Sequence, residues 1–299
     1  MAKKQKAKKQ KTKKRKAAKK SSARMAGRRA ISVATSADKT VKQRVAAMAA
    51  APLAVCESEK DLQAMLKVLS DSSEPIAVRL AALQSLGAAA FSVLSFESCR
   101  ADYIATLRKV ADDPDPELRQ RVLGILMREK DGYAQRKLLD GLKNPAKALL
   151  PPEKALQLLS YDVHADAYSV ARDILKKPPN DEAKREALRL LAADAKAVPL
   201  FEKVLRDKKE LRENRQIAAS ALHALHPDKL QQSARKILLD KSDYADIKAT
   251  SLTALEQFGD EEALGKDKAL LQSINRFRAS KAPAKYKQTA RRFLSKYDQ

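Results

Sequence analysis

The stretch VRLAALQSL, residues 78–86, decides the fold because similar stretches recur along the chain. With Leu86 as the anchor, clear later copies end at Leu126, Leu191, Leu222, Leu255 and Leu294, each with a basic residue seven positions before its anchor. Weaker copies end at Leu159 and at Ala49. From Leu86 onward the anchors lie 40, 33, 32, 31, 33 and 39 residues apart. Such a period is typical of a solenoid of stacked helical pairs.

The composition predicts an all-α protein. The 299 residues are 44% hydrophobic but include only 7 glycines and 4% aromatic residues, so the turn and strand residues of a β protein are scarce. No apolar run approaches the roughly 18 residues of a transmembrane helix, and the N-terminus lacks the apolar core of a signal peptide. Two cysteines, Cys56 and Cys99, are too few for a disulfide framework, and we expect both to pack as small apolar residues.

The basic charge is concentrated at the two chain ends. Of the net charge of +24, residues 1–29 contribute +15 and residues 276–299 contribute +7, which leaves +2 for residues 30–275. This asymmetry is the main functional signal in the sequence, because a flexible basic segment joined to a nearly neutral body suggests a tether to a polyanion.

The expected domain organisation is a tail followed by a repeat array. Residues 1–36 contain almost no large apolar side chain, so we expect a disordered basic tail and linker. Residues 37–299 form the predicted solenoid, with an N-terminal cap at 37–57 and repeats at 58–297. The longer anchor spacings predict insertions within 87–96 and 267–282, which we place in loops.

The repeat unit resembles a known family. Asp71 and Pro75, followed by Val78-Arg79, Ala81-Ala82 and Leu86, resemble the HEAT repeat in its short bacterial form, called phycobilisome-lyase-like. The resemblance implies an α-α superhelix of about six to seven helical pairs. It leaves function open, because this family includes scaffolds, lyase subunits, a hydroxylase and DNA-repair enzymes.

The recurring basic residues have two interpretations, a row of phosphate contacts or a structural ladder. In HEAT-like arrays an arginine at this position pairs with the acidic residue of a turn, so the resemblance favours the ladder. The acids close before the first five basic residues are Asp71, Asp113, Asp181, Asp207 and Asp243. The predicted ladder consists of Arg79, Arg119, Lys184, Arg215, Lys248 and Lys287.

The sequence offers no convincing catalytic or metal site. His223 and His226 lie three positions apart, but with His164 they are the only histidines, and the paired His-Glu motifs of the hydroxylase branch are absent. The chain has no Trp, on which the DNA-glycosylase branch relies, and the cluster of Tyr161, Tyr168 and neighbouring acids is explained by a turn. We therefore predict no catalytic residue, no metal and no cofactor.

The N-terminal cations are the candidate nucleic-acid contacts. A flexible arm of 15 cations releases counterions from DNA or RNA without reading sequence, and aromatic residues for base stacking are absent. A solubility tail is the alternative, whereas a membrane anchor lacks a second signal. The predicted contacts are Lys3, Lys4, Lys6, Lys8, Lys9, Lys11, Lys13, Lys14, Arg15, Lys16, Lys19, Lys20, Arg24, Arg28 and Arg29.

These observations predict a non-enzymatic helical-repeat scaffold. Its groove is expected to bind a protein partner, and its arm to tether the assembly to nucleic acid. The alternative is an enzyme-associated HEAT-like protein, either a bilin-lyase-like factor or a divergent DNA-repair protein. The expected location is cytoplasmic, associated with the nucleoid in a bacterium or nuclear in a eukaryote, since two cysteines suggest a reducing compartment.

Overall fold

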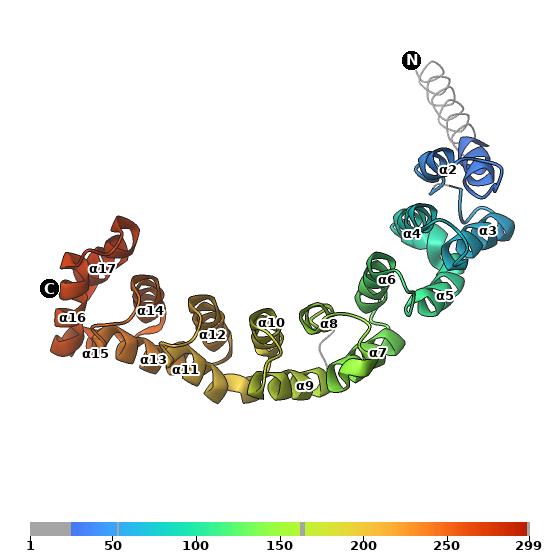
Figure 1. The fold of residues 1–299 in the computed structure, drawn as a ribbon. Helices are drawn as coiled ribbons and strands as arrows, with labels where there is room; N and C mark the ends of the chain where they lie inside the picture. The colour runs from blue at the N-terminus through green and yellow to red at the C-terminus, as the bar shows by residue number, and fades with distance from the viewer. Residues whose placement is uncertain (1–24, 53, 162–164, 298–299) are drawn as a thin grey trace, which may run out of the picture. The chain divides into compact units, whose positions relative to one another are not determined.

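The computed structural model describes residues 25–52, 54–161 and 165–297, and every regular element in these ranges is a helix (Figure 1). The all-α fold class is therefore confirmed. The chain divides into two compact units, residues 1–150 and 151–299, which we describe separately. Among the described helices, none is both long and apolar enough to cross a membrane.

The first unit contains helical pairs in two layers. A helical segment at residues 25–34 precedes α2, α4 packs against α2 and α3, and α6 packs against α4 and α5 (Figure 1). The elements are α2 (Val41–Met48), α3 (Glu59–Ser70), α4 (Ile76–Ala90), α5 (Val93–Val110), α6 (Pro116–Arg128), α7 (Gly132–Lys143) and the 3-10 turn η1 (Pro145–Lys147).

The second unit repeats this arrangement. One layer consists of α8, α10, α12, α14 and α17, and the other includes α11, α13 and α16 (Figure 1). The elements are α8 (Pro152–Leu159), α9 (Ala165–Lys176), α10 (Asp181–Leu191), η2 (Ala195–Ala197), α11 (Val198–Arg206), α12 (Arg212–Leu225), α13 (Pro227–Leu239), α14 (Ala245–Phe258), α15 (Glu261–Lys266), α16 (Lys268–Ala279) and α17 (Ala284–Tyr297).

Polar caps fix where many helices begin. The Ser58 hydroxyl accepts a hydrogen bond from the backbone N–H of Asp61 (3.1 Å) at the start of α3. The carboxylates of Asp115 and Asp131 accept backbone hydrogen bonds at the starts of α6 and α7. These caps satisfy amides that have no partner inside the helix.

The anchor leucines form the interior of each unit. All seven, from Leu86 to Leu294, are buried, which confirms the repeat register that the spacing predicts. At the C-terminal end, Phe293, Leu294 and Tyr297 of α17 pack into a cluster with residues of α13, α14 and α16. Burying apolar side chains of successive helical pairs against one another stabilises such an array, because each pair alone leaves one face exposed.

The predicted N-terminal linker differs from the structure. Residues 25–34 are helical, and Ile31 and Ala34 are buried. The helix approaches its neighbour closely, since a Cβ added at Gly27 would lie 2.7 Å from the Ala54 Cβ. Small side chains therefore provide this packing in place of a recognisable apolar stripe. Residues 1–24 lie outside the described part of the chain.

The register of the first repeat also differs from the prediction. The copy ending at Ala49 would place Lys42 in the basic slot, but the buried basic residue is Arg44, and Ala51, seven positions later, is fully buried. The segment predicted as a cap at 37–57 thus contributes the second helix of a complete helical pair. Alanines in place of leucine anchors concealed this register.

The insertion predicted within 87–96 is not a loop. Its residues extend α4 to Ala90 and begin α5 at Val93, so the extra length lies in two long helices. Phe91 and Leu94, at this junction, are 90% and 97% exposed. The insertion predicted within 267–282 is not a loop either. Most of it forms α16, which begins where the Asp267 carboxylate accepts a hydrogen bond from the Leu270 N–H (3.1 Å).

The two cysteines form a disulfide, contrary to the expectation of separate small apolar residues. Cys56 and Cys99 are bonded across a sequence separation of 43 residues, with their Cα atoms 6.3 Å apart. The bond joins the turn before α3 to α5. Disulfides are uncommon in reducing compartments, so the argument from cysteine number for such a location does not hold.

Candidate functional site

Arg215 shows the geometry of the basic ladder most completely. It is fully buried, and its Nε donates to the Leu205 carbonyl (2.8 Å) ten residues earlier. Its two terminal nitrogens donate to the two carboxylate oxygens of Asp243 (2.7 and 2.6 Å), in the turn before α14. The side chain thus joins two consecutive repeats with a bidentate ion pair.

Arg79 and Arg44 repeat this arrangement in the first unit. Arg79 donates from Nε to the Leu69 carbonyl (3.0 Å) and from a terminal nitrogen to Asp113. Arg44 donates to the Ala34 carbonyl (2.9 Å) and binds Glu74 through both terminal nitrogens (2.6 Å each). In all three cases the carbonyl lies ten residues before the arginine, and the acid belongs to the turn of the following repeat.

The remaining predicted ladder residues have other partners. Lys184 binds Glu210 (2.6 Å) rather than Asp207, and Arg119 donates to the carbonyls of Leu149 and Asp113 (2.6 Å each). Lys248 and Lys287 each donate a hydrogen bond to a backbone carbonyl at 3.4 Å. Asp71 and Asp207 instead accept backbone hydrogen bonds within their own turns. The structure therefore brings Asp113 and Asp243 to ladder arginines, but not Asp71 or Asp207.

A second row of ion pairs, which the sequence analysis missed, connects helices of the other layer. An arginine binds the capping aspartate of the next helix in this layer, and the aspartates begin α7, η2 and α16. The pairs are Arg108–Asp131, Arg172–Asp194 and Arg235–Asp267. The available signal was an arginine followed 22 to 32 residues later by a capping aspartate.

This second row should contribute modestly to stability. Burial alone would raise the pKa of Asp131, but the Arg108 hydrogen bond and the Ala134 and Tyr133 amides outweigh it and hold the pKa below its ordinary value. Because the Arg108 side chain is 49% exposed, we expect Arg108→Met to lower the free energy of unfolding by at most about 1 kcal/mol. Denaturant titration at low and high salt checks this. A loss several times larger, unaffected by salt, would contradict it.

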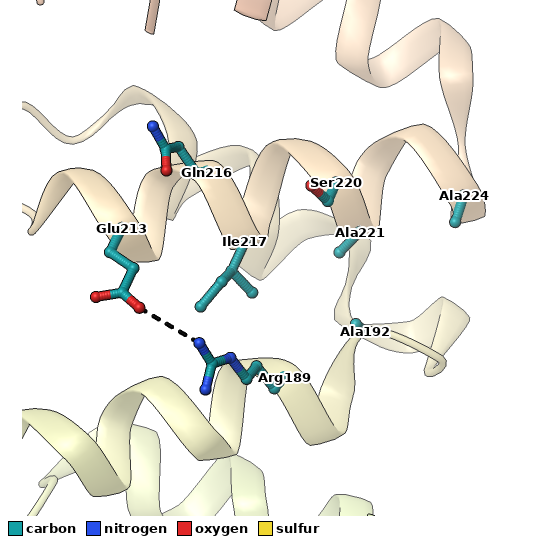
Figure 2. Close-up of a pocket in the computed structure, with 8 residues that line it drawn as sticks. All are labelled: Arg189, Ala192, Glu213, Gln216, Ile217, Ser220, Ala221 and Ala224. Carbon is teal, nitrogen blue, oxygen red and sulfur yellow. Dashed lines mark hydrogen bonds and ion pairs between the residues drawn. The ribbon is translucent and has the colours of Figure 1, made fainter. Parts of the chain in front are cut away.

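The candidate binding surface lies between α10 and α12 in the second unit (Figure 2). A groove of about 490 Å³ separates Arg189 and Ala192 from one face of α12. Arg189 Nη2 lies 3.3 Å from Glu213 Oε1 across one end of the groove, as the dashed line in Figure 2 shows. The residues contributed by α12 are Glu213, Gln216, Ile217, Ser220, Ala221 and Ala224.

The groove combines small side chains with a charged rim. Its floor toward the C-terminal end of α12 consists of small side chains, Ser220, Ala221 and Ala224. Its rim carries Arg189 and Glu213, which offer both signs of charge.

The histidines and tyrosines of the described ranges do not form a common site. The His223 ring packs against Phe258, with ring centroids 4.5 Å apart, and His226 lies between α12 and α13. Tyr161 is exposed and Tyr168 is half-buried, whereas His164 lies outside the described residues. Within the described ranges, no group of three His, Cys, Asp or Glu side chains is placed to hold a metal ion.

Two of the predicted nucleic-acid contacts, Arg28 and Arg29, lie in the described part of the chain. Arg28 and Arg29 are exposed on the first helix, and Arg28 Nε lies 3.8 Å from Glu57 Oε2 and 3.9 Å from Asp61 Oδ2. Arg28 therefore belongs to the folded part of the chain and not to a free arm. The others lie outside the described residues: Lys3, Lys4, Lys6, Lys8, Lys9, Lys11, Lys13, Lys14, Arg15, Lys16, Lys19, Lys20 and Arg24.

In each unit, stacked helical pairs are joined by buried Arg–acid ion pairs, an architecture like that of HEAT-like repeats. No family model matches the chain, and no curated protein matches it significantly. A structure of the CpcE–CpcF complex of phycocyanin lyase from Nostoc sp. PCC7120 is similar, with 18% identity, a TM-score of 0.38 and coverage of 84% of this chain and 92% of that one. Human deoxyhypusine hydroxylase in complex with glycerol is also similar, with 16% identity, a TM-score of 0.34 and coverage of 80% and 96%.

These comparisons correct one expectation. We predicted that the chain is not an enzyme because its sequence shows no catalytic motif. The two structures named above are those of a lyase and a hydroxylase, so the prediction that the chain is not an enzyme is wrong and we withdraw it. At 16% and 18% identity the likeness concerns the fold and assigns no activity to this chain.

Proposed function

We propose that this protein is a helical-repeat scaffold that binds a protein partner in the groove between α10 and α12. The observation that carries the proposal is the groove itself, open along one face of α12 with small residues in its floor and Arg189 and Glu213 at its rim. An amphipathic segment fits such a surface because its apolar side chains contact the floor while its polar groups meet the rim.

The exposed apolar residues of the first unit support a role in protein binding. Phe91 and Leu94 are almost fully exposed at the junction of α4 and α5. Large aromatic and aliphatic side chains contribute much of the binding free energy when a partner buries them, and exposed apolar patches commonly mark interaction sites. We include this junction in the proposal as a second contact, on a separate unit from the groove.

A matched pair of variants tests the groove. Ser220→Arg with Ala224→Arg fills the groove from exposed positions of α12, and Ser169→Arg with Gln232→Arg adds the same charge to exposed positions of α9 and α13. We expect proteins that copurify with the native chain from its own cells to be lost with the first pair, by about tenfold or more, and retained with the second. Equal recovery with both pairs would contradict the proposal.

The N-terminal segment supports a second part of the proposal, a tether to nucleic acid. Residues 1–24 contain 13 Lys or Arg and no acid, whereas residues 30–275 carry a net charge of only +2. A segment of this composition binds polyanions through counterion release without sequence preference. The salt dependence of DNA binding by the full chain and by a chain without residues 1–24 tests this tether.

A further inference from the structure

The basic ladder has a break at Lys248. The acids that bind Arg44, Lys184 and Arg215 each stand two positions before the second helix of the next repeat, at Glu74, Glu210 and Asp243. For Lys248 the equivalent position, two before α17, is Ala282. The repeat therefore retains its buried cation but lacks the carboxylate that would neutralise it.

The Lys248 ammonium is poorly satisfied by the protein. The residue is only 7% exposed, and its Nζ makes one long hydrogen bond, 3.4 Å, to the Lys241 carbonyl. The Phe277 ring lies on another side, with its centroid 5.9 Å from Nζ. Burying an ammonium without an ionic partner is unfavourable, so the site should favour any anion that can reach it.

A pocket gives such an anion access to Lys248. It has a volume of about 440 Å³ and lies among the turn before α14, α16 and the turn before α17. Besides Lys248, three cations line it, Lys241, Arg276 and Lys281, and all three are exposed. The remaining lining residues are Asp243, Ala245, Ser273, Phe277, Ser280 and Ala282.

The charge of the pocket is strongly positive. Asp243 is the single carboxylate of the lining, and both its oxygens are bound by Arg215. In the described part of the chain, no ion pair links a carboxylate to Lys241, Lys248, Arg276 or Lys281. Burial lowers the pKa of the Lys248 ammonium, and the nearby carboxylates of Asp243 and Asp240 only partly oppose this. A bound anion would neutralise the charge of Lys248, as Asp243 neutralises that of Arg215.

We propose that this pocket binds the phosphate group of a small phosphorylated molecule, with Lys248 as the buried contact and Arg276 and Lys281 at the entrance. A phosphate suits the site better than a carboxylate because it carries about −1.5 to −2 charge and three acceptor oxygens. The four cations of the lining can donate several hydrogen bonds to those oxygens. The volume exceeds that of a single phosphate, so the rest of the molecule has space beside Phe277. This inference is independent of the groove between α10 and α12.

Calorimetric titration of the full chain with pyrophosphate, at constant ionic strength, tests the proposal. Lys248→Met is expected to weaken binding by about 10- to 100-fold, because it removes a charged donor from a buried contact. Ala282→Asp places a carboxylate at the ladder position that lacks one, where it should compete with pyrophosphate for Lys248 and weaken binding to a similar extent. Ala282→Asn should leave the affinity for pyrophosphate unchanged. Lys236→Met, at an exposed position of α13, removes the same charge outside the pocket and should leave the affinity unchanged.

Thermal denaturation distinguishes an anion site from a purely structural lysine. Without pyrophosphate, Lys248→Met should melt at the same temperature as the native chain or higher, and Ala282→Asp should melt higher. Loss of stability in Lys248→Met together with unchanged pyrophosphate affinity in Ala282→Asp would overturn the proposal. If Lys248→Met fails to fold, the comparison of Ala282→Asp with Ala282→Asn decides, and equal affinities in those two variants reject the site.

Discussion

Replacing Arg215 with methionine is expected to lower the free energy of unfolding by about 3–5 kcal/mol. The guanidinium is fully buried and makes three hydrogen bonds, to Leu205 and to both oxygens of Asp243, whose side chain is only 2% exposed. Methionine preserves much of the volume but leaves the Asp243 carboxylate and the Leu205 carbonyl without this partner. The loss should therefore exceed that of an ordinary surface ion pair by several-fold.

Arg212→Met provides a matched control for this prediction. Arg212 lies one turn earlier on α12, its side chain is 61% exposed, and its ion pair with Asp246 spans 4.0 Å, so the expected loss is below about 1 kcal/mol. In an Arg215→Met variant that also carries Asp243→Leu, most of the stability should return, because neither partner of the buried ion pair is left without the other. Chemical denaturation of all four proteins measures these differences. Similar losses from Arg215→Met and Arg212→Met would show that the ladder is not a stabilising element.

Affinity for duplex DNA is expected to fall by about 10³ to 10⁵ between 50 and 200 mM salt, if roughly 6 to 10 N-terminal cations contact phosphates. Each neutralised phosphate releases condensed counterions, so the logarithm of the binding constant decreases linearly with the logarithm of the salt concentration. Two unrelated DNA sequences should bind equally. Fluorescence anisotropy over a series of salt concentrations measures both the slope and the sequence preference.

The control for DNA binding is a deletion of residues 1–24. It removes 13 basic residues and leaves the first helix, in which Ile31 and Ala34 are buried, whereas a deletion through residue 29 would remove half of that helix. We expect the shortened chain to keep its melting temperature and to lose most of its DNA affinity. Undiminished binding would instead locate the contact on the helical repeats.

The sequence predicts the fold well where large aliphatic anchors mark the repeat. Leu86, Leu126, Leu191 and Leu222 are all fully buried at the expected register. It fails at the N-terminal repeat because Ala34 and Ala51 take the place of such anchors and a glycine permits close approach of the helices. Alanine carries little periodic signal, so small-residue packing between helices is difficult to distinguish from a linker.

The candidate sites were less accessible to sequence analysis. The groove depends on Arg189 from α10 facing residues of α12, a pairing that only the stacking of two repeats determines. The partners of the ladder depend on turn geometry, which is why Lys184 binds Glu210 and not the nearer-numbered Asp207. The missing carboxylate beside Lys248 can be found in the sequence, because alignment of the turns places Ala282 at the position of Asp243. That this leaves a buried cation without an acidic partner follows only from the burial of Lys248 in the structure.

The most direct test of the proposed scaffold function is site-specific photo-crosslinking in the native cells. A photoreactive amino acid at Ala224, exposed in the groove, is compared with the same amino acid at Gln232, exposed on α13. We predict a discrete crosslinked protein from position 224 that disappears when Ser220→Arg is added, and no such product from position 232. The same products from both positions, or products from position 224 that persist with Ser220→Arg, would contradict the account.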